Sequence, residues 1–363
     1  MDPRDSSNVI ETPLAHLHRE AGAKMGVWFG CALPDAFGDW RAEYEAVKNG
    51  VALIDKSYRA FLSFAGPDRV RYLNAILTNN IKDLTPGQGN VSLFLNPQGH
   101  IQAEVETYAE AERLFCISFA MIRESLIAAL DKYIIMDDVT LTDETDRYGT
   151  LALEGPKTAD VVKELTGLNL TELAELGWRD SPLGEIPCRV FRRSAGGVAG
   201  ADFLIEREHL AEAWSWLVKT VKNHGGIAVG YTALNALRLQ QGIPWFGYDF
   251  GEKQIPHEAG LQDSHISYTK GCYTGQEIVE RVRSRGQVNR VRVSLKFDAK
   301  VPPEAGTSLL IDGKEVGTLT RSGFSPALGS AIGMGYVRRE KSVLGNTLVC
   351  SGNVATVVVT PIA

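Results

Sequence analysis

The stretch AFLSFAGPDRVRYLNAIL, residues 60–77, indicates the fold more clearly than any other part of the sequence. It begins as an apolar strand, turns at Gly66-Pro67 and continues with apolar residues at helical spacing. A second stretch, GTLALEGPKTADVVKEL at residues 149–165, follows the same plan and turns at Gly155-Pro156. Two strand–turn–helix units of this kind predict two related α+β halves, and chance similarity of two short segments is the alternative.

The segments around these two units predict further elements of both kinds. Strand candidates are short apolar runs bounded by turn residues, whereas helix candidates carry an apolar stripe. Residues 233–261 are rich in Gly, Pro and aromatic side chains, and we expect neither a linker nor a regular helix there. The expected strands are 91–96, 101–109, 113–119 and 139–143, and the expected helices are about 123–135 and 207–224.

The character of the sequence changes at about residue 291. From there on, short apolar segments alternate with glycine-containing turns, and helical periodicity is almost absent. This pattern predicts a small all-β barrel or sandwich at the C-terminal end of the sequence.

The composition excludes several classes of protein. Hydrophobic residues make up 44% and charged residues 23%, which is ordinary for a soluble globular chain. The net charge of −6 argues against a nucleic-acid binder held by bulk electrostatics. The five cysteines form no C-x-x-C pair, so we expect no cysteine-ligated metal or cluster. A polar N-terminal segment and short apolar runs predict no signal peptide and no membrane helix, and we expect a cytoplasmic protein.

The segment KGCYTGQEIVE, residues 270–280, is the strongest candidate for chemistry. Thr274 and Glu277 stand three positions apart ahead of an apolar run, which predicts a capping box with Thr274 as the N-cap of a helix. Cys272 would then lie just outside the helix N-terminus, where the helix dipole and Lys270 favour a thiolate. A buried, inert turn cysteine fits the local sequence equally well.

Basic side chains concentrate in the helix that follows. Such a run is usually a solvated face, and an anion-binding patch is the alternative. Arg238, which sits among leucines, requires a carboxylate or a ligand as partner. His257 and Glu258 are adjacent but lack a third ligand at useful spacing, so no metal site is predicted. The candidate anion patch consists of Arg281, Arg283 and Arg285.

Several segments resemble the folate-binding superfamily of the glycine-cleavage T-protein, an aminomethyltransferase. The resemblance covers nearly the whole chain. Within the superfamily, KGCYTGQE is similar to the signature of the YgfZ-type branch, whose mitochondrial relatives serve iron–sulfur protein assembly. The other similar segments are TPLAHLHREAGAKM, EYEAVKNGVALIDKS, ALRLQQGIPWFGYD and GKEVGTLTRSGFSPALGSAIGMGYV.

The resemblance implies two interleaved, ferredoxin-like α+β subdomains around a folate pocket, followed by a C-terminal all-β barrel. The first subdomain would be discontinuous and combine residues 1–55 with residues 145–290. The second would span residues 56–144, and the barrel would span residues 291–363.

The chain departs from the family at two acidic positions. Where the aminomethyltransferases carry an Asp-Asp pair at the folate site, an ungapped alignment places Ala103 and Glu104. Since neighbouring residues on a strand face opposite sides, we do not expect Glu104 to replace the missing carboxylate by a simple swap. The family's pterin-contacting glutamate falls on Ala201, or on Asp202 if the gap lies elsewhere.

The leading expectation is a YgfZ-type protein that binds tetrahydrofolate or a one-carbon derivative and assists iron–sulfur client proteins in assembly or repair. Cys272 would be its working thiol, with Lys270 beside it. The alternative is a folate-dependent aminomethyl- or methyltransferase that uses Glu104, and a transfer-RNA accessory role through the arginine-rich helix is a third reading. The folate-binding residues implied by the resemblance are Tyr108, Arg238, Tyr273 and Glu104.

Overall fold

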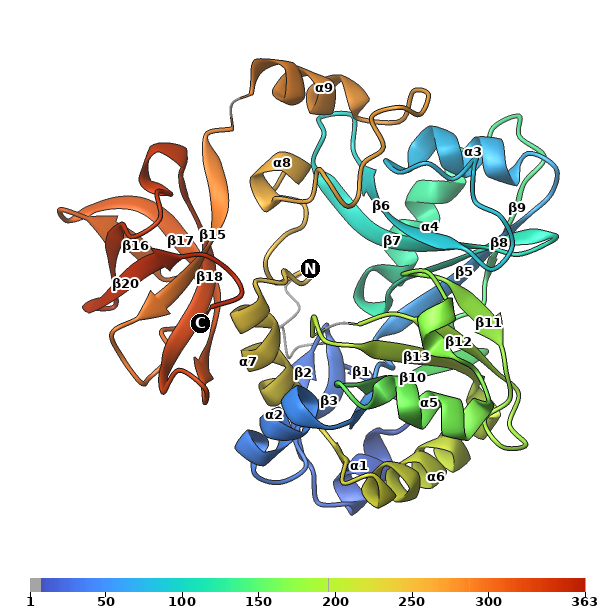
Figure 1. The fold of residues 1–363 in the computed structure, drawn as a ribbon. Helices are drawn as coiled ribbons and strands as arrows, with labels where there is room; N and C mark the ends of the chain where they lie inside the picture. Colours follow the sequence, from blue (N-terminus) through green and yellow to red (C-terminus); the bar gives the residue numbers. More distant parts are fainter. Residues whose placement is uncertain (1–7, 195, 287, 363) are drawn as a thin grey trace.

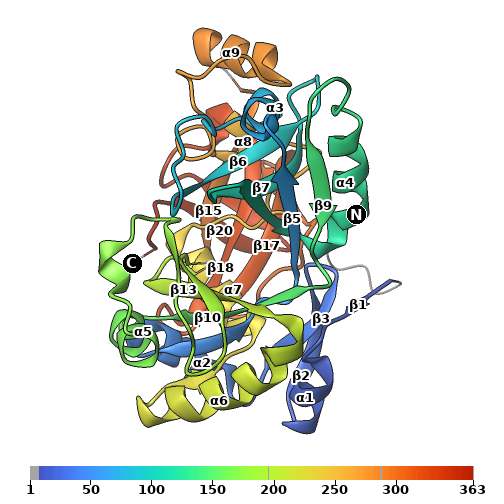
Figure 2. The ribbon, with the colours of Figure 1, turned by 90° about the vertical axis from the view of Figure 1, so that its right-hand side faces the viewer.

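The computed structural model describes residues 8–194, 196–286 and 288–362. Figure 1 shows a closed C-terminal barrel on one side and two α+β parts on the other, with helix α7 between the barrel and one of them. The turned view in Figure 2 places helix α9 at one end of the molecule and helix α6 at the opposite end. The expected α+β class with a C-terminal barrel is confirmed. No helix in these described ranges is long and apolar enough to cross a membrane.

Residues 59–143 build one antiparallel sheet of five strands, in the order β6-β7-β8-β5-β9. One face of this sheet carries α3 and α4, and the apolar side chains between them form a separate core. The predicted strands and helix in this region are confirmed, although α4 ends four residues earlier than expected. The bounds are β5 Arg59–Ala65, α3 Arg69–Ile76, β6 Gly89–Leu95, β7 Ile101–Ala109, β8 Arg113–Phe119, α4 Arg123–Asp131 and β9 Thr140–Asp143.

The second part is a six-stranded sheet in the order β11-β12-β13-β10-β4-β14. Helices α5 and α6 cover one of its faces, and Trp214 of α6 is buried in that core. The bounds are β4 Ala52–Asp55, β10 Tyr148–Glu154, α5 Thr158–Thr166, β11 Trp178–Asp180, β12 Cys188–Arg192, β13 Gly200–Glu206, α6 Leu210–Asn223 and β14 Ile227–Ala228.

The two strand–turn–helix units predicted from the sequence are present as β5–α3 and β10–α5. Both turns require glycine. Gly66 has φ +98° and a Cβ there would lie 2.3 Å from the carbonyl oxygen of Asp138. Gly155 has φ +130° and a Cβ there would lie 2.4 Å from the carbonyl oxygen of Gly50. A side chain at either position would force the chain off its path, so the repeated glycines fix the repeated geometry.

A three-stranded sheet in the order β1-β3-β2 and two helices precede the first unit. Helix α2 begins at Asp39, whose side chain accepts a hydrogen bond from the amide of Arg41. It packs against α7. The bounds are β1 Ile10–Glu11, α1 Ala15–Glu20, β2 Lys24–Trp28, β3 Cys31–Ala36 and α2 Trp40–Asn49.

The expectation that residues 233–261 form no regular helix is wrong for their first part. Helix α7 spans Tyr231–Gln241 and is buried along most of its length. The segment ALNALRLQQ contains neither Gly nor Pro, so nothing in it interrupts a helix. The irregular composition begins only at Gly242, which ends the helix with φ +77°.

The C-terminal strands close into a six-stranded barrel, in the order β15-β18-β17-β16-β19-β20. The barrel alternative is thus confirmed over the sandwich. Strands β17 and β18 pack on α7. The bounds are β15 Arg290–Phe297, β16 Ser308–Ile311, β17 Lys314–Ser325, β18 Ser330–Arg338, β19 Thr347–Cys350 and β20 Asn353–Val358.

Two helices lie between α7 and the barrel, α8 at Pro256–Ala259 and α9 at Gln276–Arg285. The predicted capping box of α9 is wrong. Its N-cap residue is Gly275, with φ +82°, and no side chain caps the helix. Thr274 lies one residue before the N-cap, because Gly275 in the left-handed conformation makes the turn into the helix. The loop before Gly275 is held instead by hydrogen bonds of Lys270 and Thr274 to backbone carbonyls of α3.

Candidate functional site

The helix-free faces of the two large sheets meet in the middle of the molecule. Phe61, Tyr108 and Phe115 of the five-stranded sheet pack there against Phe191 and Leu204 of the six-stranded sheet. Beside this contact lies a partly open space of about 50 Å³, which we call the central cavity. Its polar wall consists of Lys56, Arg59, Glu104, Glu106, Arg193 and Asp202.

The polar wall contains ion pairs within each sheet and one, between Arg193 and Glu106, that joins the two sheets. Lys56 Nζ lies 2.6 Å from Asp202 Oδ1 and 3.2 Å from Glu154 Oε1. Arg59 and Arg193 both contact Glu106, with the Arg193 Nε to Glu106 Oε1 distance at 3.1 Å. Three cations therefore pair with three carboxylates, Glu106 and Asp202 of the cavity wall and Glu154, which does not line the cavity. Buried charges of this kind are tolerated only when paired.

Burial and neighbouring charges shift the pKa values of the acids in this network in different directions. Burial alone would raise the pKa of Glu106, but the charges of Arg59 and Arg193 outweigh it and hold that pKa well below its usual range. Burial raises the pKa of Asp202 despite the opposing charge of Lys56. Since Lys56 pairs with both Asp202 and Glu154, its single charge offsets only part of the free-energy cost of burying the two carboxylates. Glu106 is thus a fixed anion, and Asp202 is closer to protonation.

Strand alternation decides which acids reach the cavity. On β7, Ala103 points into the core under α3 and α4, so Glu104 and Glu106 on the other face point into the cavity. On β13, Ala201 is buried in the core under α5 and α6, and its neighbour Asp202 lines the cavity. At both pairs of positions where the resemblance predicts a departure from the family, the alanine faces a core and an acid stands next to it.

Aromatic side chains form the remaining wall of the central cavity. Phe29 stacks on Tyr58 with the ring centroids 4.2 Å apart and the planes inclined by 18°. Phe119 lies against Phe246, with centroids 5.0 Å apart. Aromatic faces beside convergent donors and acceptors suit a flat heteroaromatic ring that carries N–H groups along its edge. Trp245 completes the aromatic wall.

Phe246 also borders a second, larger space. This cleft of about 790 Å³ lies between residues 246–254 and the barrel strands β17 and β18. Glu104 and Glu106 do not line it. The central cavity is smaller than the roughly 300–1,000 Å³ of a typical small-molecule site, whereas the cleft is within that range. Phe246 lines both spaces and therefore lies at the boundary between the central cavity and the cleft.

The four predicted folate-binding residues do not gather at one place. Glu104 lines the central cavity. Tyr108 lies behind the wall, buried, and its hydroxyl donates to Glu106 Oε2 at 2.8 Å. Arg238 is fully buried in α7, and Tyr273 is buried in the loop before α9. Neither of these two lines the central cavity, and a direct role of either in folate binding stays a prediction.

Arg238 has the carboxylate partner that its apolar surroundings required, and the partner belongs to the chain itself. Its guanidinium contacts Asp249, donates to Asn235 Oδ1 at 3.0 Å and donates to the Ile243 carbonyl at 3.2 Å. The guanidinium carbon lies 4.8 Å from the centre of the Trp245 ring. Arg238 thus supports one wall of the central cavity from behind.

The KGCYTG loop lies on the C-terminal end of α3. Lys270 Nζ donates to the carbonyls of Asn74 at 2.6 Å, Asn79 at 2.9 Å and Leu77. The amide of Thr274 donates to the Ala75 carbonyl at 3.2 Å. The hydrogen bonds of Lys270 thus go to carbonyls of α3 and the turn after it, and its ammonium group also lies 5.1 Å from the centre of the Tyr273 ring. These contacts account for the lysine without the thiol.

Cys272 is exposed, whereas the other four cysteines are buried. Burial raises the pKa of Cys31, Cys116 and Cys188 to about 12, so these thiols are unreactive. Since Cys272 is exposed, its interpretation as a buried, inert turn cysteine is wrong. Its role as a working thiol stays a prediction, and it does not line the central cavity.

The candidate anion patch on α9 is only partly free. Arg281 is exposed. Arg283 pairs with Glu280 at 3.5 Å and stacks on Tyr268, with the guanidinium carbon 4.1 Å from the ring centre. The side chain of Arg285 lies outside the described part of the chain. Pairing and stacking reduce the charge available to a polyanion, and an anion-binding function of this helix stays a prediction.

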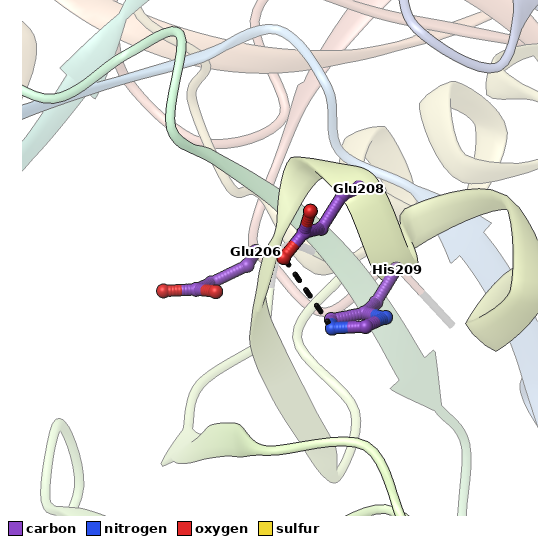
Figure 3. Close-up of side chains that lie close together, drawn as sticks. All are labelled: Glu206, Glu208 and His209. Atoms are coloured by element: carbon purple, nitrogen blue, oxygen red, sulfur yellow. Dashed lines mark ion pairs between the residues drawn. The ribbon is translucent and has the colours of Figure 1, made fainter.

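One group of side chains at the junction of β13 and α6 has a metal-ligand composition. Glu206, Glu208 and His209 place ligand atoms within 4.8 Å of one another (Figure 3). Glu206 already pairs with Arg147 at 3.0 Å, Glu208 is exposed and His209 is half-buried. Exposed acids and histidines of this kind commonly form weak ion pairs, and the group carries no metal assignment.

Several site residues were not identified from the sequence. Lys56, Arg59, Glu106, Arg193 and His265 belong to the network around Glu104, and none was a candidate. The sequence does contain one signal for Glu106, because AEVET places two acids two positions apart on a predicted strand and therefore on one face. The other four come from distant segments, and only the fold brings them together.

Comparisons with known proteins agree with this architecture. Residues 14–265 match the model of the GCVT N-terminal domain, and residues 290–361 match that of the glycine cleavage T-protein C-terminal barrel domain. The chain is 26% identical to an aminomethyltransferase of Halothermothrix orenii over 93% of its own length and 94% of the relative's. It is 28% identical to an aminomethyltransferase of Koribacter versatilis, over 95% of its own length and 93% of the relative's. The solved structure of the glycine cleavage system aminomethyltransferase T of Bartonella henselae superimposes with a TM-score of 0.88 at 24% identity, covering 98% of both chains, which shows the fold.

Proposed function

The chain belongs to the glycine cleavage T-protein family, and we propose that it is a folate-dependent one-carbon transferase that accepts tetrahydrofolate in the central cavity. The transferred group would be an aminomethyl or methyl carbon. This is the alternative function considered from the sequence, and the family relatives named aminomethyltransferase support it over the iron–sulfur reading.

The observation that carries the proposal is the direction of Glu104. The missing acid at Ala103 argued against transfer chemistry, because alanine cannot accept a proton. On β7, however, position 103 faces the core and position 104 faces the cavity. A carboxylate is therefore retained at the place where the substrate would bind, and the substitution by alanine affects a position that the substrate cannot reach.

The charges around Glu104 suit the proposed reaction. Tetrahydrofolate supplies an amine nitrogen that loses a proton as it bonds to the incoming carbon, while the bond between that carbon and its leaving group on the donor breaks and the leaving group keeps the electron pair. Glu104 accepts that proton, and general-base contributions of this kind are typically about 10²–10⁴-fold in rate. Glu106 stays ionised beside Arg59 and Arg193, so it holds the geometry of the wall. Asp202, whose burial raises its pKa, pairs with donors on the edge of the ring.

Binding measurements test the first half of the proposal. We expect tetrahydrofolate to bind the wild-type protein by calorimetry and to bind a Glu104→Gln variant with less than about a threefold change in Kd, because glutamine retains the size and one acceptor of glutamate. Asp202→Ala should weaken binding about tenfold or more, since it removes a ring contact and leaves Lys56 with one partner fewer. Equal affinity of Asp202→Ala and wild type would contradict the placement of the ring.

The iron–sulfur reading is the second candidate, and the exposure of Cys272 favours it. Five cysteines supply one exposed thiol, and it lies in the KGCYTG loop. In this reading the protein binds folate as proposed and presents Cys272 to iron–sulfur clients. Cys272→Ala should then preserve folding and tetrahydrofolate binding and abolish activity in cells. Full complementation of a deletion strain by Cys272→Ala would remove this candidate and leave the transferase proposal intact.

A further inference from the structure

Glu104 is connected to the molecular surface through two side chains. His265 Nε2 lies 3.0 Å from Glu104 Oε1, and His265 Nδ1 lies 2.7 Å from Ser264 Oγ. Ser264 is exposed, His265 is 8% exposed, and Glu104 lines the central cavity. A continuous hydrogen-bonded path of three side chains therefore leads from the cavity to solvent.

The path is held in place by the segment that follows α3. Thr78 is fully buried, and its hydroxyl donates to the His265 carbonyl at 2.6 Å. The His265 amide donates to the Leu261 carbonyl at 3.0 Å, and the Ser267 amide donates to the Thr78 carbonyl at 3.0 Å. These bonds fix the backbone on both sides of the imidazole. The ring is thus aimed at Glu104 by the fold, and not by its contact with Glu104 alone.

We propose that Ser264, His265 and Glu104 form a proton relay between solvent and the central cavity. The proposal rests on the function proposed above, in which Glu104 receives a proton from the substrate. A substrate ring held between the aromatic walls excludes water from Glu104 on the cavity side. The proton taken from the substrate then needs an exit that the substrate does not block, and His265 lies on the opposite side of the carboxylate.

The transfer balances without any further reactant. Glu104, protonated at Oε1 by the substrate, gives its proton to His265 Nε2. The proton on Nδ1 passes to Ser264 Oγ while the hydroxyl proton of Ser264 passes to water. One proton leaves, no electron is transferred, and the imidazole exchanges one neutral tautomer for the other. Passage in the opposite direction carries a proton back to Glu104, which passes it to the leaving group of the one-carbon donor, and the ring returns to its starting tautomer.

The cationic side chains near this path already form ion pairs with other carboxylates. Arg59 and Arg193 are bound to Glu106, and Lys56 is bound to Asp202 and Glu154. Of the described residues, His265 is the one whose side chain lies within ion-pairing distance of the Glu104 carboxylate. Among the described residues, the relay therefore competes with no other hydrogen bond or ion pair of the Glu104 carboxylate.

The position of Ser264 permits a matched test, because it is exposed and two substitutions of similar shape differ in the hydroxyl alone. Ser264→Thr retains the hydroxyl and Ser264→Val replaces it by a methyl group that also blocks water from Nδ1. Neither change touches Glu104 or the cavity wall. Relay function predicts that kcat for folate-dependent transfer falls about tenfold or more in Ser264→Val and stays within about twofold in Ser264→Thr.

His265→Asn provides a second comparison, because asparagine can still donate a hydrogen bond but cannot pass a proton. We expect its kcat to fall about 10²-fold while the Kd for tetrahydrofolate stays within about threefold. A merely structural histidine would move binding and turnover together. Wild-type turnover in Ser264→Val and in His265→Asn would overturn the relay.

A second readout does not depend on turnover. The exchange of the His265 ring proton with solvent is measured by nuclear magnetic resonance on the full chain, with and without tetrahydrofolate. With the relay intact, exchange should be at least about tenfold slower in Ser264→Val than in Ser264→Thr. Equal exchange in the two variants would contradict the relay. Slower exchange in Ser264→Val together with no transferase turnover in wild type would support the relay and reject the proposed function alone.

Discussion

Lys270 places its ammonium group on three backbone carbonyls, of Asn74, Leu77 and Asn79. The first two belong to the end of α3, where a positive charge interacts favourably with the helix dipole. From the sequence, Lys270 was expected to act on its near neighbour Cys272. Its hydrogen-bond acceptors instead lie more than 190 positions away along the chain, and no local pattern identifies contacts of that kind. For Glu104, by contrast, a local pattern is sufficient, because strand alternation places its side chain on the face of the sheet opposite to that of Ala103.

Lys270 leads to a prediction about pH. Burial lowers the pKa of Lys270 to about 8 in the folded state, whereas an unfolded lysine titrates near about 10.4. Between these values the unfolded chain binds more protons, so this group makes the free energy of unfolding rise with pH. Relative to Lys270→Met, which cannot titrate, the wild type should gain about 2 kcal/mol between pH 7 and pH 10.

Thermal or urea unfolding of both proteins at several pH values checks this expectation. The comparison with Lys270→Met removes the contributions of all other titrating groups, which are the same in both proteins. A stability difference between the two proteins that does not change from pH 7 to pH 10 would contradict a buried, titrating Lys270.

At the scale of elements, the repeated strand–turn–helix units were predictable because each is encoded within a short segment. Apolar periodicity located β5–α3 and β10–α5, and the glycines that shape both turns are visible in the sequence. The start of α9 was not predictable in the same way. Thr274 and Glu277 have the spacing of a capping box, yet Gly275 enters the helix with φ +82°. A Cβ on Gly275 would lie 2.7 Å from the Asn96 carbonyl oxygen, so the β6–β7 hairpin decides this turn.

A pair of neighbouring substitutions tests that correction. Gly275→Ala should lower the free energy of unfolding by about 2 kcal/mol, because it combines positive φ with a close backbone contact. Thr274→Ala should change it by less than about 0.5 kcal/mol, since the Thr274 side chain does not cap the helix. Chemical denaturation of both variants measures the two values. A loss of about 1 kcal/mol in Thr274→Ala would instead be the signature of an N-cap.

At the scale of the whole molecule, the barrel was recognisable from its short strands and glycine turns, but its attachment was not. Asp249 joins three parts of the chain: it pairs with Arg238 of α7, accepts from the Trp245 amide at 2.9 Å and accepts from the Thr320 hydroxyl of β17 at 2.6 Å. The sequence showed that Arg238 needed a partner. It contained no sign that the same partner would also anchor the barrel.

Removal of the charge on Asp249 should therefore destabilise the whole molecule. Asp249→Asn leaves Arg238 buried without a counter-ion, and we expect a loss of about 3 kcal/mol or more. Adding Arg238→Met to this variant removes the uncompensated charge and should recover part of the loss. Scanning calorimetry of the single and double variants measures both effects. A double variant less stable than Asp249→Asn would contradict the pairing.

The central claim is that Glu104 performs proton transfer during one-carbon transfer to folate. The most direct measurement is the formation of methylene-tetrahydrofolate from tetrahydrofolate and an aminomethylated carrier protein. Glu104→Gln is compared with the wild type, and the exposed Glu185→Gln serves as the matched control. We predict turnover by the wild type and the control, and a loss of about 10²-fold or more in Glu104→Gln with tetrahydrofolate still bound. Equal turnover in Glu104→Gln and wild type would contradict the account.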